Sequence, residues 1–131
     1  MPLLKLIINF KISILILIGI LYLSFAPPAT FQGIPSFKNE DKIVHIFFYI
    51  ALTGALIFEF NKLKTNKSFT VFFLSSICFP VFIGGLVEII QPILYYPRTA
   101  SWLDWFSDIA GVGIAWILMR TLKIFPINLR N

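Results

Sequence analysis

The stretch from residue 88 to residue 111 holds most of the side chains in this chain that could take part in chemistry. Carboxylates can act as general acids and bases or bind divalent cations, and arginine grips phosphate or carboxylate through paired hydrogen bonds. The stretch lies between two long apolar segments, and ionisable groups are costly in lipid, so we interpret it as a candidate functional site. Its polar residues are Glu88, Gln91, Arg98, Ser101, Asp104 and Asp108.

A second group of polar side chains lies earlier in the chain, at residues 41 to 49. Asp41, His45 and Tyr49 are four residues apart, so a helix here would carry all three on one face. Lys42 lies beside them in the sequence. The helices that carry the two groups would meet on one side of a membrane, with Arg98 in the loop between the later two. We therefore expect a single polar site.

Spacing within the later segments also matches helical faces. Glu88 and Gln91 are three residues apart, and Asp104, Asp108 and Gly111 follow one another at intervals of four and three. Residues at these intervals are neighbours on a helix surface. Each helix would therefore present its polar residues together.

The composition indicates an integral membrane protein. Of the 131 residues 58% are hydrophobic and 13% are charged, and the mean hydropathy is +0.87. Soluble domains are roughly 45–50% apolar and about 25% charged, so they could not bury this much apolar surface. The formal charge of +5 does not indicate nucleic-acid binding, because the basic residues flank apolar runs. The single cysteine, Cys78, excludes an intramolecular disulfide.

Four apolar runs predict an all-α, four-helix membrane domain over residues 1–131, with helices at about residues 6–26, 42–60, 69–91 and 102–122. A helix needs roughly 20 apolar residues to cross the hydrocarbon core. The first run also resembles a signal peptide, since Lys5 and Lys11 precede its apolar core and small residues end it. Pro27 would hinder cleavage there, so we expect this run to be retained as a helix.

Small residues predict close helix contacts. Pro80 and the Gly84-Gly85 pair predict a kink or a close approach in the third helix. Gly111, Gly113 and Ala115 would give the fourth helix a small surface on which a neighbouring backbone could pack.

The distribution of Lys and Arg predicts the orientation, because cytoplasmic loops of membrane proteins carry an excess of these residues. Eight lie before the first run, between the second and third runs or after the fourth, and three lie in the other two loops. Both termini should therefore be cytoplasmic, and the polar site should face outward. Tyr95, Tyr96, Trp102 and Trp105 would form an aromatic belt at that outer surface.

Several motifs occur in a fixed order: D-K-I-V-H-I-F-F-Y at 41–49 and E-I-I-Q at 88–91, followed by Arg98, Ser101, Asp104 and Gly111. In order and spacing they resemble the VanZ-like family of small bacterial membrane proteins, over nearly the whole chain past the first helix. The resemblance implies a four-helix protein of the bacterial cytoplasmic (inner) membrane, and the name-giving member is linked to resistance to the glycopeptide teicoplanin. Asp108 departs from the family pattern, which has asparagine there.

Several of these residues also have a purely structural interpretation. Ser101 and Asp104 match the capping box of a helix start, and Asp41 suits a first helical turn. His45 could bond a neighbouring backbone group or carboxylate, and Arg98 could serve only as an anchor at the membrane surface.

Three other acidic residues differ in how easily they are explained. Glu88 and Asp108 lie too deep in their helices for capping, and each would cost on the order of 2.5–3.5 kcal/mol if ionised at mid-membrane. They need a positive partner (Arg98, His45 or Lys42), protonation or a cavity. We interpret Glu59 as one half of a surface ion pair with Lys62.

The first functional hypothesis is recognition of an anionic envelope ligand. Two helix N-termini would converge with Lys42, His45 and Arg98, a combination suited to phosphate or carboxylate. The expected ligand-binding residues are Arg98, Lys42, His45, Glu88, Gln91, Ser101, Asp104, Asp108, Asp41 and Tyr49. A lipid-linked cell-wall precursor or a glycopeptide would suit this site, in addition to membrane lipids and without nucleic acid. The oligomeric state is left open.

Two alternatives remain open. In an intramembrane hydrolase or transferase, Glu88, Asp104 and His45 are the candidates for acid and base catalysis. No cofactor is required, although Asp104, Asp108 and Glu88 offer the oxygen ligands of a divalent cation. The other alternative is a polar plug that fixes helix packing without any ligand.

Overall fold

The computed structural model describes residues 2–63, 67–95, 99–125 and 129–130. The described chain is helical apart from a two-residue parallel strand pair. Its elements in order are α1 (Pro2–Asn9), α2 (Lys11–Phe25), the 3₁₀ turn η1 (Pro28–Phe31), α3 (Glu40–Lys62), β1 (Lys67–Ser68), α4 (Phe69–Phe73), the π-helical segment η2 (Leu74–Cys78), α5 (Phe79–Leu94), α6 (Trp102–Thr121) and β2 (Leu129–Arg130).

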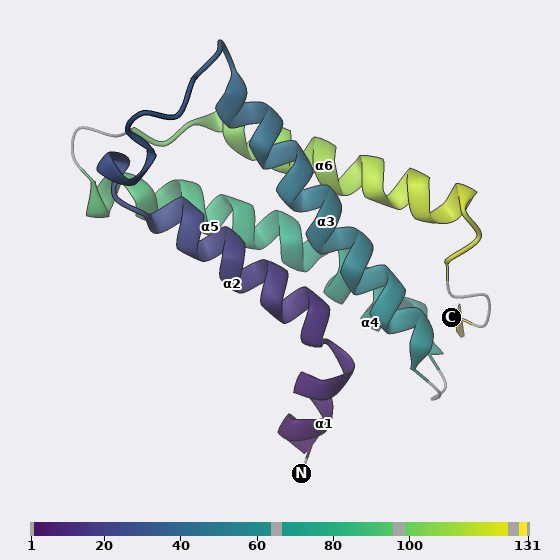
Figure 1. Cartoon of the computed structure of the whole chain (residues 1–131). Coiled ribbons are helices and arrows are strands. Elements are labelled where there is room, and N and C mark those ends of the chain that lie inside the picture. Colours follow the sequence, from purple (N-terminus) through teal and green to yellow (C-terminus); the bar gives the residue numbers. More distant parts are fainter. Residues whose placement is uncertain (1, 64–66, 96–98, 126–128, 131) are drawn as a thin grey trace.

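Three described helices are long and apolar enough to cross a membrane: Glu40–Lys62, Phe69–Leu94 and Trp102–Thr121. They confirm the all-helical prediction and the second, third and fourth predicted helices to within a few residues. A fourth span is present if α1 and α2 are counted together. Figure 1 shows α2, α3, α5 and α6 running side by side.

The first run was predicted to be one helix, and this is wrong, because it is divided between α1 and α2, which are bent by 78° relative to each other. The break exposes the backbone N–H groups that begin α2. Glu59 of α3 accepts hydrogen bonds from the N–H groups of Ile12 at 2.8 Å and Ser13 at 3.0 Å, and from the Ser13 hydroxyl at 2.6 Å. A carboxylate at a helix N-terminus satisfies these unpaired donors and complements the helix dipole.

This arrangement corrects the interpretation of Glu59 as a surface ion pair. Its side chain is only 3% exposed, and its partners belong to α2. Lys62 instead lies 4.0 Å from the centre of the Phe58 ring. Glu59 is therefore the residue that joins the start of α2 to the end of α3.

The other end of α2 is held by α5 and the residue that follows it. Gln91 donates through Nε2 to the carbonyl of Ser24 at 2.9 Å, and the Tyr95 hydroxyl donates to the carbonyl of Phe25 at 2.6 Å. The last carbonyls of a helix have no partner within that helix, so both bonds act as C-terminal caps. Side chains from outside α2 therefore satisfy backbone groups at both of its ends.

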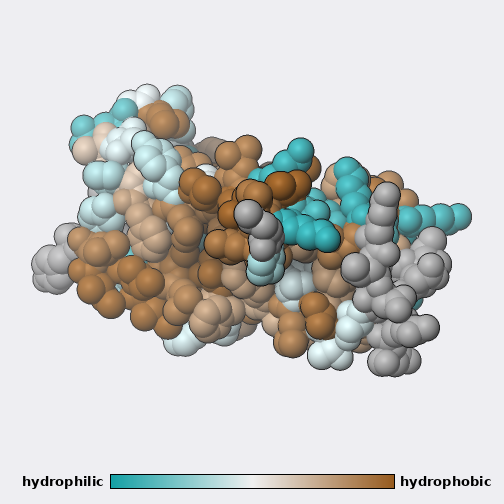
Figure 2. Space-filling model, turned by 90° about the horizontal axis from the view of Figure 1, so that it is seen from below, coloured by the Kyte–Doolittle hydropathy of each residue, from teal (hydrophilic) through white to brown (hydrophobic). Residues whose placement is uncertain are grey.

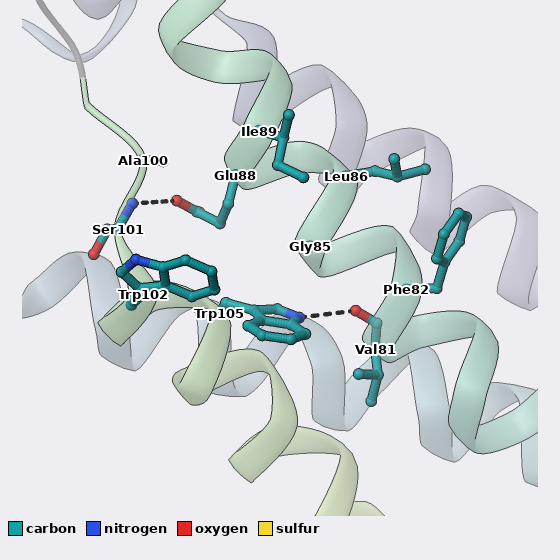
Figure 3. A pocket seen from close by; sticks show the side chains of 10 residues that line it. All are labelled: Val81, Phe82, Gly85, Leu86, Glu88, Ile89, Ala100, Ser101, Trp102 and Trp105. Atoms are coloured by element: carbon teal, nitrogen blue, oxygen red, sulfur yellow. Dashed lines mark hydrogen bonds between the residues drawn. The ribbon is translucent and has the colours of Figure 1, made fainter.

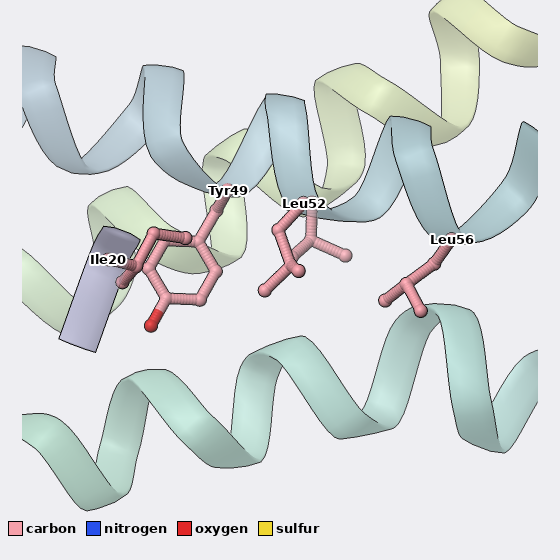
Figure 4. Close-up of a cluster of buried hydrophobic side chains, with 5 residues drawn as sticks. Ile20, Tyr49, Leu52 and Leu56 are labelled. Carbon is pink, nitrogen blue, oxygen red and sulfur yellow. The ribbon is translucent and has the colours of Figure 1, made fainter. Parts of the chain in front are cut away.

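The most extensive contact between helices is made by α3 and α6. Gly111 lies at this contact: a Cβ added there would be 2.5 Å from the carbonyl oxygen of Ile46 and 3.0 Å from Cβ of Tyr49. The predicted close approach is thus confirmed at Gly111, whereas a Cβ on Gly113 would meet nothing within 4 Å. The buried side chains beside this contact are Ile20, Tyr49, Leu52, Leu56 and Val112 (Figure 4).

The third span changes its hydrogen-bond register before Pro80. The N–H of Phe79 donates to the carbonyl of Leu74, five residues earlier, which is the pattern of a π-helix. Proline has no N–H to donate and its ring crowds the carbonyl four residues before it. The π segment therefore ends where Pro80 would disturb a regular α-helix.

The polar site and α1 lie at different ends of the helices. Figure 1 shows α1, the end of α3 and the end of α6 away from the end where α5 finishes and α6 begins. In Figure 2, hydrophobic residues cover much of the visible face, and hydrophilic residues gather toward the right and at the upper left. The exposed large hydrophobic residues belong to every span, which is the surface that a lipid environment requires.

Candidate functional site

The structure brings five of the predicted residues into one cluster, which we name the polar cluster: Lys42, His45, Glu88, Asp104 and Asp108. Two come from the first turns of α3, one from α5 and two from α6. The close approach of α3 and α6 at Gly111 places the starts of these two helices together. The prediction that the two groups of polar residues meet is therefore confirmed for these five residues.

Lys42 connects two carboxylates. Its ammonium lies 2.9 Å from Oδ2 of Asp41 and 3.1 Å from Oδ1 of Asp104. Asp41 is exposed, whereas the Asp104 side chain is only 8% exposed. Lys42 thus offsets the charge of Asp104 and joins the start of α3 to the start of α6.

His45 and Asp108 form the second pair between α3 and α6. Nδ1 of His45 lies 2.7 Å from Oδ1 of Asp108, and the Asp108 residue is fully buried. Asp108 Oδ2 lies against Gly84 of α5, where an added Cβ would come within 2.5 Å of it. The contact predicted at Gly84 is thus made by the side chain that departs from the family pattern.

Glu88 and Ser101 complete the start of α6. The Ser101 hydroxyl accepts from the N–H of Asp104 at 3.3 Å, which confirms the predicted N-cap. The N–H of Ser101 donates to Oε2 of Glu88 at 3.0 Å. In a capping box the third residue of the helix would accept that second bond. Here Glu88 of α5 accepts it, and Asp104 is left to pair with Lys42.

Other residues predicted for the site lie apart from the polar cluster or outside the residues that the structure describes. Gln91 points to α2 and caps it, and Tyr49 is buried in the hydrophobic core. Asp41 reaches the cluster only through Lys42. Arg98 and Tyr96 lie outside the described residues. The ligand-binding roles of these residues stay predictions.

An apolar groove adjoins the polar cluster between α5 and the start of α6 (Figure 3). Its volume is about 310 Å³, and Glu88 and Ser101 belong to its lining. Trp105 packs across it and donates through Nε1 to the carbonyl of Val81 at 3.0 Å. Sequence reasoning assigned Trp102 and Trp105 to a belt and did not foresee this groove. Its lining residues are Val81, Phe82, Gly85, Leu86, Glu88, Ile89, Ala100, Ser101, Trp102 and Trp105.

Comparison of the chain with protein-family models, with curated proteins and with solved structures gives no match. The resemblance to the VanZ-like family therefore rests on the motifs quoted above.

Proposed function

We propose that the chain is a VanZ-like protein that crosses a bacterial cytoplasmic membrane four times and binds an anionic, lipid-linked envelope ligand at its outer side. Three long apolar helices and the bent α1–α2 pair support the four spans. The excess of basic residues at the other end of the helices supports cytoplasmic termini. An effect on glycopeptide tolerance follows from the family resemblance alone.

The observation that carries this proposal is the position of the apolar groove beside the polar cluster. Glu88 belongs to both, and Ser101, which also lines the groove, donates its backbone N–H to Glu88. A ligand with an apolar chain and a polar head would place the chain in the groove and the head against the cluster. Ligand sites are commonly apolar clefts with a few placed polar groups.

The charge of the cluster restricts how an anionic head could bind. Lys42 is partly exposed and offers a positive charge, but Asp41 and Asp104 already lie beside it. A phosphate would therefore approach through Lys42 and would gain from a further positive charge.

A second candidate function is an intramembrane hydrolase or transferase that acts on such a lipid. It is favoured by the contact of His45 with Asp108, since a carboxylate that orients an imidazole is common in general-base catalysis. Binding would then be followed by turnover. The ligand-free polar plug predicts neither binding nor turnover.

The test is a melting experiment on the detergent-purified protein with a long-chain polyprenyl phosphate and, separately, the uncharged polyprenol. We expect the phosphate alone to raise the Tm by about 5 °C or more at saturating concentration, because a ligand that binds only the folded state stabilises it. Ala100→Trp, which fills the groove, should abolish the rise. Lys42→Ala should reduce it, and Lys38→Ala in the exposed loop should not. No rise in the wild-type protein, or equal rises with both lipids, would contradict the proposal.

A further inference from the structure

Three side chains of the polar cluster are arranged as the ligands of a metal ion. His45 of α3, Glu88 of α5 and Asp104 of α6 each offer a ligand atom, and these atoms lie within 4.8 Å of one another. In a tetrahedral site the ligand atoms lie about 2.0–2.2 Å from the ion and therefore about 3.3–3.6 Å from one another. The cluster thus needs to contract by up to about 1.5 Å to close on an ion.

Asp108 holds His45 in the orientation that a metal ligand requires. With Asp108 ionised, its carboxylate can only accept hydrogen bonds, and Nδ1 of His45 carries the hydrogen in their 2.7 Å contact. The lone pair of a neutral imidazole is then on Nε2. Metal-binding histidines nearly always donate their other ring nitrogen to a carboxylate, a carbonyl or water in this way.

Glu88 provides an independent observation. The residue is 4% exposed, and Oε2 accepts the N–H of Ser101. Oε1 is buried and has no hydrogen-bond partner among the described residues. A buried carboxylate oxygen without a partner is costly, and native structures rarely leave one unexplained. A cation beside His45 and Asp104 would satisfy it.

The balance of charge in the described part of the site also favours a cation. Four carboxylates, those of Asp41, Glu88, Asp104 and Asp108, lie with one lysine and one histidine. Lys42 occupies one oxygen of Asp104 and leaves the second for another partner. A divalent cation would offset two of the remaining negative charges.

We propose that His45, Glu88 and Asp104 bind one divalent transition-metal cation, with Asp108 positioning His45. One imidazole nitrogen and two carboxylate oxygens suit Mn²⁺ or Zn²⁺ better than Mg²⁺ or Ca²⁺, which prefer oxygen ligands alone. This site differs from the all-oxygen set expected from the sequence, because Asp108 turns to His45. It stands without the proposed lipid, and a bound cation would give an anionic head a second positive charge.

The test measures Mn²⁺ binding to protein that has been stripped with a chelator, through loss of the electron paramagnetic resonance signal of free Mn²⁺. No lipid ligand is added, so the result is separate from that of the lipid experiment. We expect about one ion per chain, and about 10–100-fold weaker binding in Asp108→Asn, as for other residues that orient a metal ligand. Glu88→Gln and Asp104→Asn should abolish binding, whereas Asp41→Asn should not change it.

Each variant is checked by gel filtration and circular dichroism, so that loss of binding is separated from loss of folding. The wild-type stoichiometry decides the question even if a variant fails to fold. Absence of Mn²⁺ binding by the folded wild-type protein would overturn the inference. Binding that is unchanged in both Glu88→Gln and Asp104→Asn would place the ion elsewhere and would overturn it too.

Discussion

Glu59→Ala is expected to lower the free energy of unfolding by on the order of 3 kcal/mol or more. The substitution removes the acceptor of three hydrogen bonds at the start of α2, from two backbone N–H groups and the Ser13 hydroxyl. A buried donor left without a partner costs about 1–3 kcal/mol. In lipid, water is not available to replace the lost acceptor.

Glu59→Gln keeps one acceptor oxygen, so its loss of stability should be intermediate. Glu40→Ala is the matched control on the same helix, because Glu40 accepts one exposed hydrogen bond, from the N–H of Phe37. It should change stability by no more than about 0.5 kcal/mol. Unfolding of each purified variant by denaturant measures its free energy of unfolding relative to that of the wild type. If Glu59→Ala unfolded like the wild type, α2 would not depend on Glu59.

Gly111→Ala and Gly113→Ala are expected to change stability in opposite directions. An added Cβ at Gly111 would lie 2.5 Å from the carbonyl oxygen of Ile46, which is backbone and has little freedom to move. Such overpacking costs about 1–3 kcal/mol or more. At Gly113 the same methyl group meets nothing within 4 Å, and replacing glycine with alanine inside a helix stabilises it by up to about 1 kcal/mol.

The stability of the two glycine variants is measured by thermal melting, and the same variants also test the geometry of the polar cluster. Separating α6 from α3 at Gly111 would move Asp108 away from His45, because these residues lie on the two helices that the glycine holds together. Gly111→Ala should therefore weaken Mn²⁺ binding as well as stability, and Gly113→Ala should leave binding unchanged. Equal melting temperatures of the two variants would show that the α3–α6 contact is looser than described.

Much of the fold was predictable, because a long apolar run identifies a membrane-spanning helix from the residues of that segment alone. The helices at Glu40–Lys62 and Trp102–Thr121 could be placed from hydropathy alone, and the spacing of Ser101 and Asp104 indicated the start of the latter. The break between α1 and α2 was not predictable in this way. The N–H groups freed at the break bond to Glu59, which lies 46 residues beyond Ser13 in the sequence.

The five members of the polar cluster were among the residues predicted for the site, but their internal pairing was not predictable. Helical spacing brought His45, Asp104 and Asp108 to the same end of the molecule. Which carboxylate contacts His45 depends on the crossing of α3 and α6 and on the space left by Gly84. A side chain cannot be assigned a partner from its own helical face when three helices meet.

The groove was missed for a related reason. Trp105 was expected at the membrane surface as an aromatic anchor, which is the usual position of tryptophan in a membrane protein. Its indole also reaches α5 and donates to the carbonyl of Val81. The glycine at position 85 makes room for this ring, whose Nε1 would lie 3.3 Å from an added Cβ. That pairing joins residues 24 positions apart.

The most direct test of the central claim, that groove and polar cluster together bind one lipid with an anionic head, is native mass spectrometry of the protein released from detergent. The protein is presented with equal amounts of polyprenyl phosphate and polyprenol in the presence of Mn²⁺. We predict one retained polyprenyl phosphate per chain, in preference to polyprenol, and loss of this retention in Ala100→Trp. Equal retention of the two lipids, or unchanged retention in Ala100→Trp, would contradict the claim.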